Sequence, residues 1–280
     1  MKTPGADGTP SIDEMLVATG QLKQEDVARV RHQQLAHKTE FADAAVELGL
    51  VSTDDVRLAI ARQYQSRTLS AQIAGMSPEL VCAMQPDHPV ASAIYRIRTA
   101  LLLGHKNKSG TLKIAIVGAE RGEGRTLLAA NLAIAFAQLN ARTVLIDADM
   151  REGRLHTLFH LPNEGGLARA LVQHGEFTGA TLVDGFGPLA VMTAGFAPRP
   201  EQLLSMSRLH LVMERLSQET DVVIVDTPAW SIGADARVIA AEAGMALLVT
   251  RMHAASKSNL LELANALAQD GTVMLAVPFD

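Results

Sequence analysis

Residues 113–132 read KIAIVGAERGEGRTLLAANL. An apolar segment there runs into a glycine-rich turn, and the apolar spacing after the turn predicts a helix. This is the layout of a phosphate-binding loop, which usually has Gly or Ala, four further residues, and then Gly-Lys-Ser or Gly-Lys-Thr. In that register the loop spans Ala119 to Thr126, and Arg125 stands where such loops carry lysine.

The residue types of this loop suit an anion. Gly122 and Gly124 let the backbone turn tightly, so that amide N–H groups can face phosphate oxygens, and the positive end of the following helix lies at the same place. Thr126 offers a hydroxyl to Mg²⁺, and Arg125 keeps the charge of lysine on a longer, planar group. Taken alone, the loop also fits a structural turn between a strand and a helix. Nucleotide contacts are predicted from Glu120, Arg121, Gly122, Glu123, Gly124, Arg125, Thr126 and Leu127.

From residue 112 onward, short apolar runs alternate with helical patterns. The Val, Ile and Leu content of these runs implies a parallel sheet covered by helices on both faces, and so an α/β fold. Ligands of such sheets lie beyond the carboxyl ends of the strands. Strands are predicted at Leu112–Gly118, Thr143–Asp147, Leu189–Ala194, Val222–Asp226, Ala246–Thr250 and Val273–Val277.

Two acidic motifs follow two of these strands. In TVLIDADMR (143–151), Asp147 and Asp149 share one side of the strand or its extension, which suits a hydrated Mg²⁺ or the activation of an attacking hydroxyl. In DVVIVDTPAW (221–230), Asp226 fits the acid that holds a metal through water behind a phosphate loop. Each motif alone also fits an ordinary turn. A glycine loop and two acidic motifs after three strands of one sheet, in this order, indicate a nucleotide-binding fold.

These motifs resemble those of the bacterial tyrosine kinases (BY-kinases) of exopolysaccharide and capsule assembly. That family has a Walker A loop, a Walker A′ of apolar residues plus Asp-x-Asp, and a Walker B that ends Asp-x-x-Pro. The resemblance covers about 190 residues, from Val90 to Asp280. It is strongest to the EpsG-type branch, a chain-length-determinant-associated kinase whose loop also reads GEGR. The resemblance implies a P-loop NTPase sheet of the MinD and BY-kinase type, binding of ATP and Mg²⁺, and phosphoryl transfer to tyrosine.

The resemblance also implies roles for single residues. Arg125 would contact the β- and γ-phosphates, and Asp149 would activate the acceptor hydroxyl. The implied metal ligands are Thr126, Asp147 and Asp226, and the implied catalytic set is Arg125, Asp147, Asp149 and Asp226. The related MinD and ParA partitioning ATPases carry a signature lysine where this chain has Glu120, which argues against that sister group.

Two features depart from the BY-kinase pattern. Typical members end in a tyrosine cluster, whereas this chain has only Tyr64 and Tyr95 and ends MLAVPFD, so autophosphorylation of such a tail is not expected. The helix before the first strand usually reads Glu-x-x-Arg-x-x-Arg-Thr and helps to build a ring. Here residues 92–99 keep only Arg98-Thr99 of that motif.

The N-terminal part contains an internal repeat. Residues 11–34 and 41–63 align at one offset, which pairs Ile12 with Phe41, Val17 with Val46, Gly20 with Gly49, Val27 with Val56 and Gln34 with Gln63. Each copy predicts a helix, a glycine stop and a second helix. The repeat resembles the N-terminal domain of type II secretion and pilus ATPases, but it lacks the Arg-Leu-Gly triplets with which the longer form of that domain binds cyclic di-GMP. We therefore expect a helical bundle that serves for docking or interaction.

The predicted organisation follows from these patterns. Residues 1–10 form a tail, residues 11–66 the repeat bundle, residues 67–90 a linker with several prolines, and residues 91–280 the P-loop domain.

Composition narrows the possible partners. The net charge of −5, without pooled basic residues, disfavours nucleic acid, and the single cysteine, Cys82, fits the cytoplasm. No secretory signal is expected at the N-terminus, and the most apolar helix, 127–139, is too short to span a bilayer. The resemblance implies recruitment to the inner membrane by a transmembrane chain-length determinant, or polysaccharide co-polymerase, as activator, and a possible homo-oligomer.

Three functional hypotheses remain open at this point. The first is a cytoplasmic protein-tyrosine kinase that regulates the polymerisation, chain length and export of an exopolysaccharide. The second is a catalytically weak or inactive P-loop ATPase that regulates a membrane chain-length determinant. The third, a type II secretion adaptor, rests on the N-terminal bundle alone.

Overall fold

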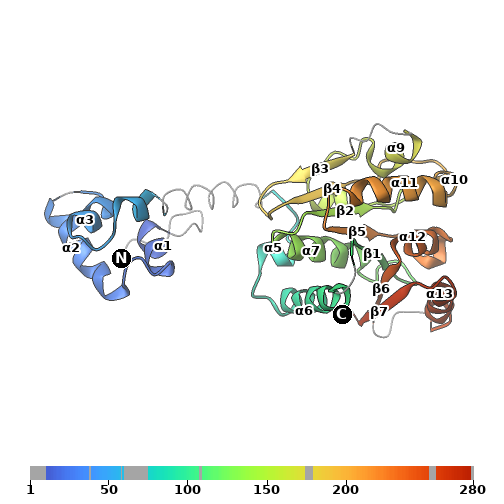
Figure 1. Cartoon of the computed structure of the whole chain (residues 1–280), viewed down its shortest axis with the longest axis horizontal. Coiled ribbons are helices and arrows are strands. Elements are labelled where there is room, and N and C mark those ends of the chain that lie inside the picture. The colour runs from blue at the N-terminus through green and yellow to red at the C-terminus, as the bar shows by residue number, and fades with distance from the viewer. Residues whose placement is uncertain are drawn as a thin grey trace. The chain divides into compact units, whose positions relative to one another are not determined.

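The computed structural model describes residues 11–37, 39–57, 59, 75–106, 109–173, 179–251 and 257–278. The chain divides into two compact units, Met1–Ala74 and Gly75–Asp280 (Figure 1).

The first unit is a small helical bundle in which the two sequence repeats take matching roles. Gly20 and Gly49 both have positive φ, at 73° and 66°, and each follows the first helix of its copy. Val27 and Val56 are both buried in one apolar cluster formed by the described residues of this unit. The elements are α1 (Ile12–Ala18), η1 (Gln24–Asp26), α2 (Val27–His37), α3 (Phe41–Glu47) and a helical turn at residues 53–57. The helical pattern expected from the repeat is thus present up to residue 57, and most of the rest of the second copy lies outside the described residues.

The second unit is built on a sheet that, within the described residues, has seven strands in the order β3-β4-β2-β5-β1-β6-β7. All neighbouring strands are parallel except β3 and β4. The strands are β1 (Leu112–Val117), β2 (Thr143–Asp147), β3 (Ala180–Val183), β4 (Leu189–Met192), β5 (Val222–Asp226), β6 (Met245–Thr250) and β7 (Val273–Pro278).

The predicted α/β fold is confirmed, and all six predicted strands are present. Sequence analysis missed β3, a short antiparallel edge strand whose Thr181 and Leu182 are exposed. An edge strand of this kind buries too little apolar surface to leave a clear pattern in the sequence.

Helices cover both faces of the sheet (Figure 1). One face carries α5 (Val81–Met84), α6 (Pro89–His105) and α7 (Arg125–Ala137); the other carries α9 (Gly166–Val172), α11 (Met206–Ser217), α12 (Asp235–Ala243) and α13 (Lys257–Gln269). Short elements follow the carboxyl ends of β2, β4 and β5, namely α8 (Leu155–Leu158), α10 (Pro200–Leu203) and η2 (Trp230–Ile232). No described helix is both long enough and apolar enough to cross a membrane.

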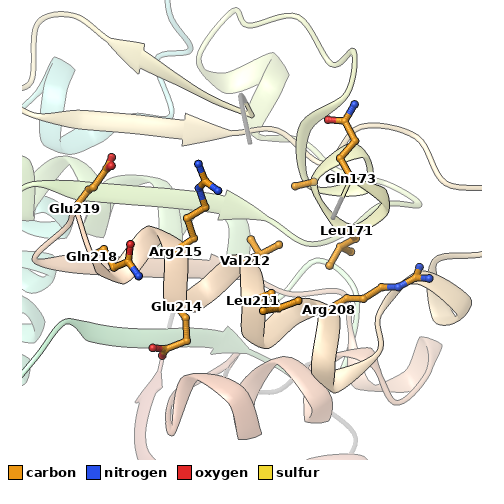
Figure 2. A pocket seen from close by; sticks show the side chains of 10 residues that line it. Leu171, Gln173, Arg208, Leu211, Val212, Glu214, Arg215, Gln218 and Glu219 are labelled. Atoms are coloured by element: carbon orange, nitrogen blue, oxygen red, sulfur yellow. The ribbon is translucent and has the colours of Figure 1, made fainter. Parts of the chain in front are cut away.

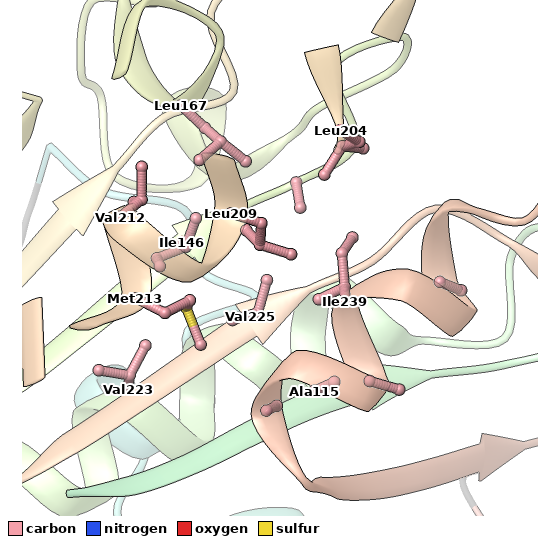
Figure 3. Packing of buried hydrophobic residues seen from close by; sticks show 14 of the residues in the cluster. Ala115, Ile146, Leu167, Leu204, Leu209, Val212, Met213, Val223, Val225 and Ile239 are labelled. Atoms are coloured by element: carbon pink, nitrogen blue, oxygen red, sulfur yellow. The ribbon is translucent and has the colours of Figure 1, made fainter. Parts of the chain in front are cut away.

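Alternation along the strands decides which face each acid occupies. Ile146 and Val225 belong to the core packed under α9, α11 and α12 (Figure 3). Because neighbouring side chains of a strand point to opposite faces, the next residues, Asp147 and Asp226, lie on the α7 face. The two carboxylates therefore share a face with the helix that follows the P-loop.

The second unit begins earlier than the sequence suggested. Residues 75–90, placed in the linker by sequence, belong to it because α7 side chains bond their backbone. Asn131 accepts a hydrogen bond from the Cys82 N–H at 2.8 Å and donates to the Glu79 carbonyl at 3.0 Å, while Gln138 donates to the Cys82 carbonyl at 2.9 Å. Such amide contacts cannot be predicted from amino-acid composition, and the prolines of this stretch are typical of a linker.

Candidate functional site

Three loops meet at one edge of the sheet because β2, β5 and β1 are neighbours. The P-loop follows β1, the Walker A′ turn follows β2 and the Walker B loop follows β5. Asp147 and Asp226 are direct partners in the parallel register, and Ile116, three residues before the loop, is the partner of Asp226 on its other side. The structure thus brings the three predicted motifs together.

The P-loop is wound tightly over Gly118. Gly122 and Gly124 both have positive φ, at 78° and 91°, and Gly124 caps α7 in the left-handed conformation. A Cβ atom at Gly118 would lie 2.6 Å from Oε2 of Glu123 and 3.0 Å from Nη1 of Arg125. The loop therefore needs glycine at this position so that its two charged side chains can pack beneath it.

Arg125 closes the P-loop from inside. Its Nη1 donates to the Glu120 carbonyl, and its Nε donates to the Thr227 carbonyl at 3.1 Å. The side chain is only 9% exposed. Burial lowers its pKa, and the nearby carboxylates of Asp226 and Glu123 oppose that shift. In this structure Arg125 joins the P-loop to the Walker B loop; the contact with phosphate stays a prediction.

Two glutamates of the loop are also engaged within the chain. The Glu123 carboxylate is 2% exposed, accepts the Glu120 N–H at 2.9 Å and lies 3.7 Å from Nη1 of Arg125. The Glu120 carboxylate accepts a hydrogen bond from Asn259 of α13. Among the predicted loop contacts, Glu123 can thus offer a nucleotide its backbone more readily than its side chain.

The remaining loop residues sit at the rim. Arg121 is exposed and pairs with Glu152 of the Walker A′ turn at 2.9 Å, which links the two loops. Thr126 and Leu127 are half-buried in the first turn of α7.

Asp226 is buried at the centre of the site. Burial raises its pKa well above the ordinary range, and the neighbouring Asp147 adds to the shift, while the nearby Thr126 hydroxyl and Arg125 guanidinium oppose it. Its Oδ1 has no hydrogen-bond partner among the described residues. Because buried polar atoms are rarely left unpaired, this oxygen is suited to a cation or its water shell.

Asp147 organises the Walker A′ turn. Its Oδ1 accepts the Asp149 N–H at 3.1 Å, and its Oδ2 accepts the Leu155 N–H at 3.0 Å. Burial raises the pKa of Asp147 to about 7. A Cβ atom at Gly153 would lie 2.8 Å from Oδ2 of Asp147, so the turn winds closely around this carboxyl.

Asp149 is the more accessible of the two Walker A′ acids. It is half-buried, and its Oδ1 accepts the N–H groups of Arg151 at 3.2 Å and Glu152 at 3.0 Å. Its Oδ2 has no hydrogen bond from the residues that the structure describes. Asp149 therefore presents a free carboxylate oxygen in a fixed orientation, which is the requirement for a proton acceptor.

Sequence reasoning missed the partners of the two site arginines. Thr227 contributes its carbonyl to Arg125 and donates its own hydroxyl to the Ile116 carbonyl at 2.8 Å. Arg151 is paired with Asp235 and Glu201. A backbone carbonyl has no sequence signature, and the acids lie 84 and 50 residues away from Arg151.

The residues present fit a P-loop magnesium site. No group of three or more His, Cys, Asp or Glu side chains with metal-holding geometry occurs in the described residues. Such a group is not required, because Mg²⁺ in these folds takes one or two carboxylates, a hydroxyl, water and phosphate oxygens. The unpaired Asp226 Oδ1 and the Thr126 hydroxyl meet that need.

A hollow of about 510 Å³ lies elsewhere, between α9 and α11 (Figure 2). Its lining combines apolar side chains such as Leu171 and Val212 with charged ones such as Arg208 and Glu219. None of the predicted site residues lines it, so it is separate from the P-loop.

Comparisons with known proteins agree with this arrangement. The family profile of the cellulose biosynthesis protein BcsQ matches residues 112–276. The putative tyrosine-protein kinase EpsB of Ralstonia solanacearum is 31% identical over 202 residues, which cover 72% of this chain and 27% of that protein. The chain thus spans only about a quarter of that relative. The tyrosine-protein kinase YwqD of Bacillus subtilis is 33% identical over 190 residues, 67% of this chain and 80% of that protein.

Solved structures show the same domain. The kinase domain of Escherichia coli tyrosine kinase ETK matches with a TM-score of 0.66 and 29% identity, over 71% of this chain and 78% of that one. MinD from Pyrococcus horikoshii, complexed with Mg-ADP, shares the fold with a TM-score of 0.51 and 19% identity, over 58% and 67% of the two chains. The chain belongs to the bacterial tyrosine-protein kinase (BY-kinase) family, and its P-loop domain is shared with the BcsQ family.

Proposed function

We propose that this chain binds ATP and Mg²⁺ at the carboxyl edge of β1, β2 and β5 and transfers the γ-phosphoryl group to a tyrosine of another protein. The observation that carries the proposal is the placement of Asp147 and Asp226 side by side on the α7 face, with Oδ1 of Asp226 buried and unpaired within the described residues. Membership of the BY-kinase family supports the choice of reaction.

Each site residue has a role in this proposal. Backbone N–H groups of residues 119–126 and the Arg125 guanidinium hold the phosphates. The metal site consists of Thr126, Asp147 and Asp226, directly or through water. When bound, Mg²⁺ supplies charge neutralisation at the phosphate oxygens.

Asp149 is the proton acceptor in this scheme. The tyrosine oxygen forms a bond to the γ-phosphorus while the bond from that phosphorus to the bridging oxygen breaks, and ADP leaves with the bridging oxygen. The hydroxyl proton passes to Oδ2 of Asp149, the oxygen that the turn leaves free. Such a reaction depends mainly on positioning and charge stabilisation.

The acceptor is proposed to lie outside this chain. Tyr95 stacks on Arg98, whose guanidinium carbon lies 5.0 Å from the ring centre, and burial raises the pKa of the Tyr95 hydroxyl. Tyr64 lies outside the described residues. We propose the cytoplasmic part of a transmembrane chain-length determinant as activator and acceptor, which would bring this protein to the inner membrane for exopolysaccharide assembly.

Assembly into a ring has weak support from α6. Arg98, retained from the ring motif, donates Nη1 to the Ala135 carbonyl of α7 at 2.6 Å. This hydrogen bond joins α6 to α7 within one chain, so it competes with any contact that the Arg98 guanidinium could make with a second subunit.

The test uses labelled ATP, Mg²⁺ and the cytoplasmic part of a chain-length protein. Wild type should label tyrosine, and Asp149→Asn should lose about 100-fold or more in rate because a positioned general base is worth that much. Asp149→Asn should keep its affinity for Mg-ADP within about twofold. Absence of tyrosine label from wild type, or equal rates for the two proteins, would refute the kinase proposal.

The structure also favours a second candidate, a nucleotide-dependent regulator without efficient transfer. Nε and Nη1 of Arg125 each donate to a carbonyl group of the protein, so closure of the loop does not require a nucleotide. A regulator of this kind should bind Mg-ATP and change its affinity for the chain-length protein without labelling it. Pull-down with and without Mg-ATP, scored beside the labelling assay, separates the two functions.

A further inference from the structure

The Walker A′ turn is held by hydrogen bonds within the turn and by the side chain of Arg151. We call Arg151 and its two acidic partners, Asp235 and Glu201, the bracket. Asp149 Oδ1 is oriented only by the N–H groups of Arg151 and Glu152 among the described contacts. The direction of the Asp149 carboxylate therefore depends on where the backbone of residues 151–152 lies.

The Arg151 side chain ties that backbone to two other elements. Nη1 donates to Oδ2 of Asp235, at the first turn of α12, and Nη2 donates to Oε2 of Glu201 in α10 at 3.0 Å. The bracket thus joins the turn after β2 to elements that follow β4 and β5. Among the described residues 149–153, Arg151 is the one whose side chain forms a hydrogen bond or ion pair with α10 or α12, while Met150 packs in the apolar core with α12.

The two arms of the bracket differ in strength. The side chain of Asp235 is 8% exposed, whereas that of Glu201 is 55% exposed. A buried charge that loses its partner is costly, while an exposed ion pair contributes little. Asp235 is therefore the arm on which the position of Arg151 depends.

We infer that Asp235 is a positioning residue for the phosphoryl-transfer reaction: through Arg151 it fixes the turn that aims Asp149 at the acceptor hydroxyl. This inference rests on the proposed role of Asp149. Asp235 touches neither nucleotide nor acceptor in this assignment, and its effect is on the rate of transfer.

A simpler role is also available to Asp235. An acid in the first turn of a helix interacts favourably with the helix dipole. If that were its only effect, Asp235 would contribute to the stability of the fold and not to the rate of transfer. The two roles are separable because the dipole does not involve Asp149, Arg151 or Glu152.

The decisive experiment is a double-mutant cycle with Asp235→Asn and Asp149→Asn, with Glu201→Gln as the matched change in the exposed arm. Asp235→Asn should lower kcat about tenfold or more, with the Kd of Mg-ADP unchanged within about twofold. It should add almost nothing in the Asp149→Asn background. Glu201→Gln should change kcat less than about threefold.

A second readout does not need catalysis. In Asp235→Asn, hydrogen exchange at the amides of Arg151 and Glu152 should accelerate, while exchange in β1 and α7 stays at the wild-type rate. Full additivity in the cycle, or exchange that is unchanged at these two amides, would overturn the inference.

Failure of the proposed function has a different signature. If wild type labels no tyrosine, the kinase proposal falls, and the exchange experiment alone decides whether Asp235 positions the turn. If wild type is active and Asp235→Asn is equally active, the kinase proposal stands and the positioning role is wrong.

Discussion

Arg125 of the P-loop and Arg151 of the Walker A′ turn each join their loop to another element, and the two arginines bond to different kinds of acceptor. Arg125 donates to the neutral backbone carbonyls of Glu120 and Thr227. Arg151 donates to the carboxylates of Asp235 and Glu201. The hydrogen-bond acceptors of Arg125 are thus neutral groups, whereas those of Arg151 are two acids that neutralise its charge.

This difference indicates what each loop is prepared to do. A buried cation bonded mainly to carbonyl groups gains free energy when an anion arrives, because Glu123 at 3.7 Å is the only acid within ion-pair distance of Arg125 among the described residues. Arg151 already has two acids within ion-pair distance and gains little from a phosphate. The P-loop is therefore built to receive charge, and the Walker A′ turn is built to stay in place.

The largest expected effect tests this difference directly by removing each arginine in turn. Arg125→Ala should weaken Mg-ADP binding by about 100-fold or more, or roughly 2.7 kcal/mol, because the loop loses both its cation and its internal tie. The affinity of Arg125→Lys for Mg-ADP should lie between those of wild type and Arg125→Ala, since one ammonium cannot reproduce the hydrogen bonds of the planar guanidinium. Isothermal titration measures all three affinities.

Arg151→Ala is the control for that measurement. It should leave the Kd of Mg-ADP within about threefold of wild type, because the charge of Arg151 is already neutralised. Equal losses in Arg125→Ala and Arg151→Ala would show that the two loops do not differ in this way.

A smaller effect is expected from the base of the P-loop. In Gly118→Ala the new Cβ would stand 2.6 Å from Oε2 of Glu123 and 3.1 Å from the Val249 carbonyl. Moving buried charged side chains should destabilise the protein by about 1–3 kcal/mol. Urea denaturation measures the change, and Gly104→Ala is the matched comparison because its Cβ would meet no atom within 4 Å and its φ is not in the left-handed region. A loss at Gly104 as large as the loss at Gly118 would contradict close packing under the loop.

The smallest expected effect is the dependence of stability on pH without nucleotide. Burial raises the pKa of Asp147 from 3.8 to about 7. Between these two pH values the carboxyl is therefore mostly neutral in the folded protein and mostly ionised in the unfolded chain. Its stabilising contribution is present below the unfolded pKa and is lost as pH rises through the folded one. Tm should therefore fall from pH 5 to pH 8 by a few degrees, at roughly 2–4 °C per kcal/mol.

Asp226→Asn sharpens this last prediction. The substitution removes one of the two facing carboxylates, so the decline of Tm with pH should flatten and Tm at pH 8 should rise, while Mg-ADP binding is lost. The same slope in wild type and in Asp226→Asn, followed by differential scanning calorimetry, would show that the facing carboxylates do not control the pH dependence.

The sequence by itself determined the fold and the place of the site. The apolar runs that end in a glycine loop, Asp147 and Asp226 are local patterns with fixed periods, and the carboxyl ends of parallel strands must share one edge. The repeat of the N-terminal unit was equally readable, since Gly20 and Gly49 recur at one offset and both take positive φ.

Tertiary structure alone decided what each charged group bonds to. Arg125 lies 102 residues from the Thr227 carbonyl that it holds, and Arg151 lies 84 residues from Asp235. Nothing in a local pattern ranks such distant partners, because side-chain contacts depend on strand order and on the packing of helices over the sheet. The same reason applies to Asn131, whose bonds to Cys82 and Glu79 draw residues 75–90 onto α7.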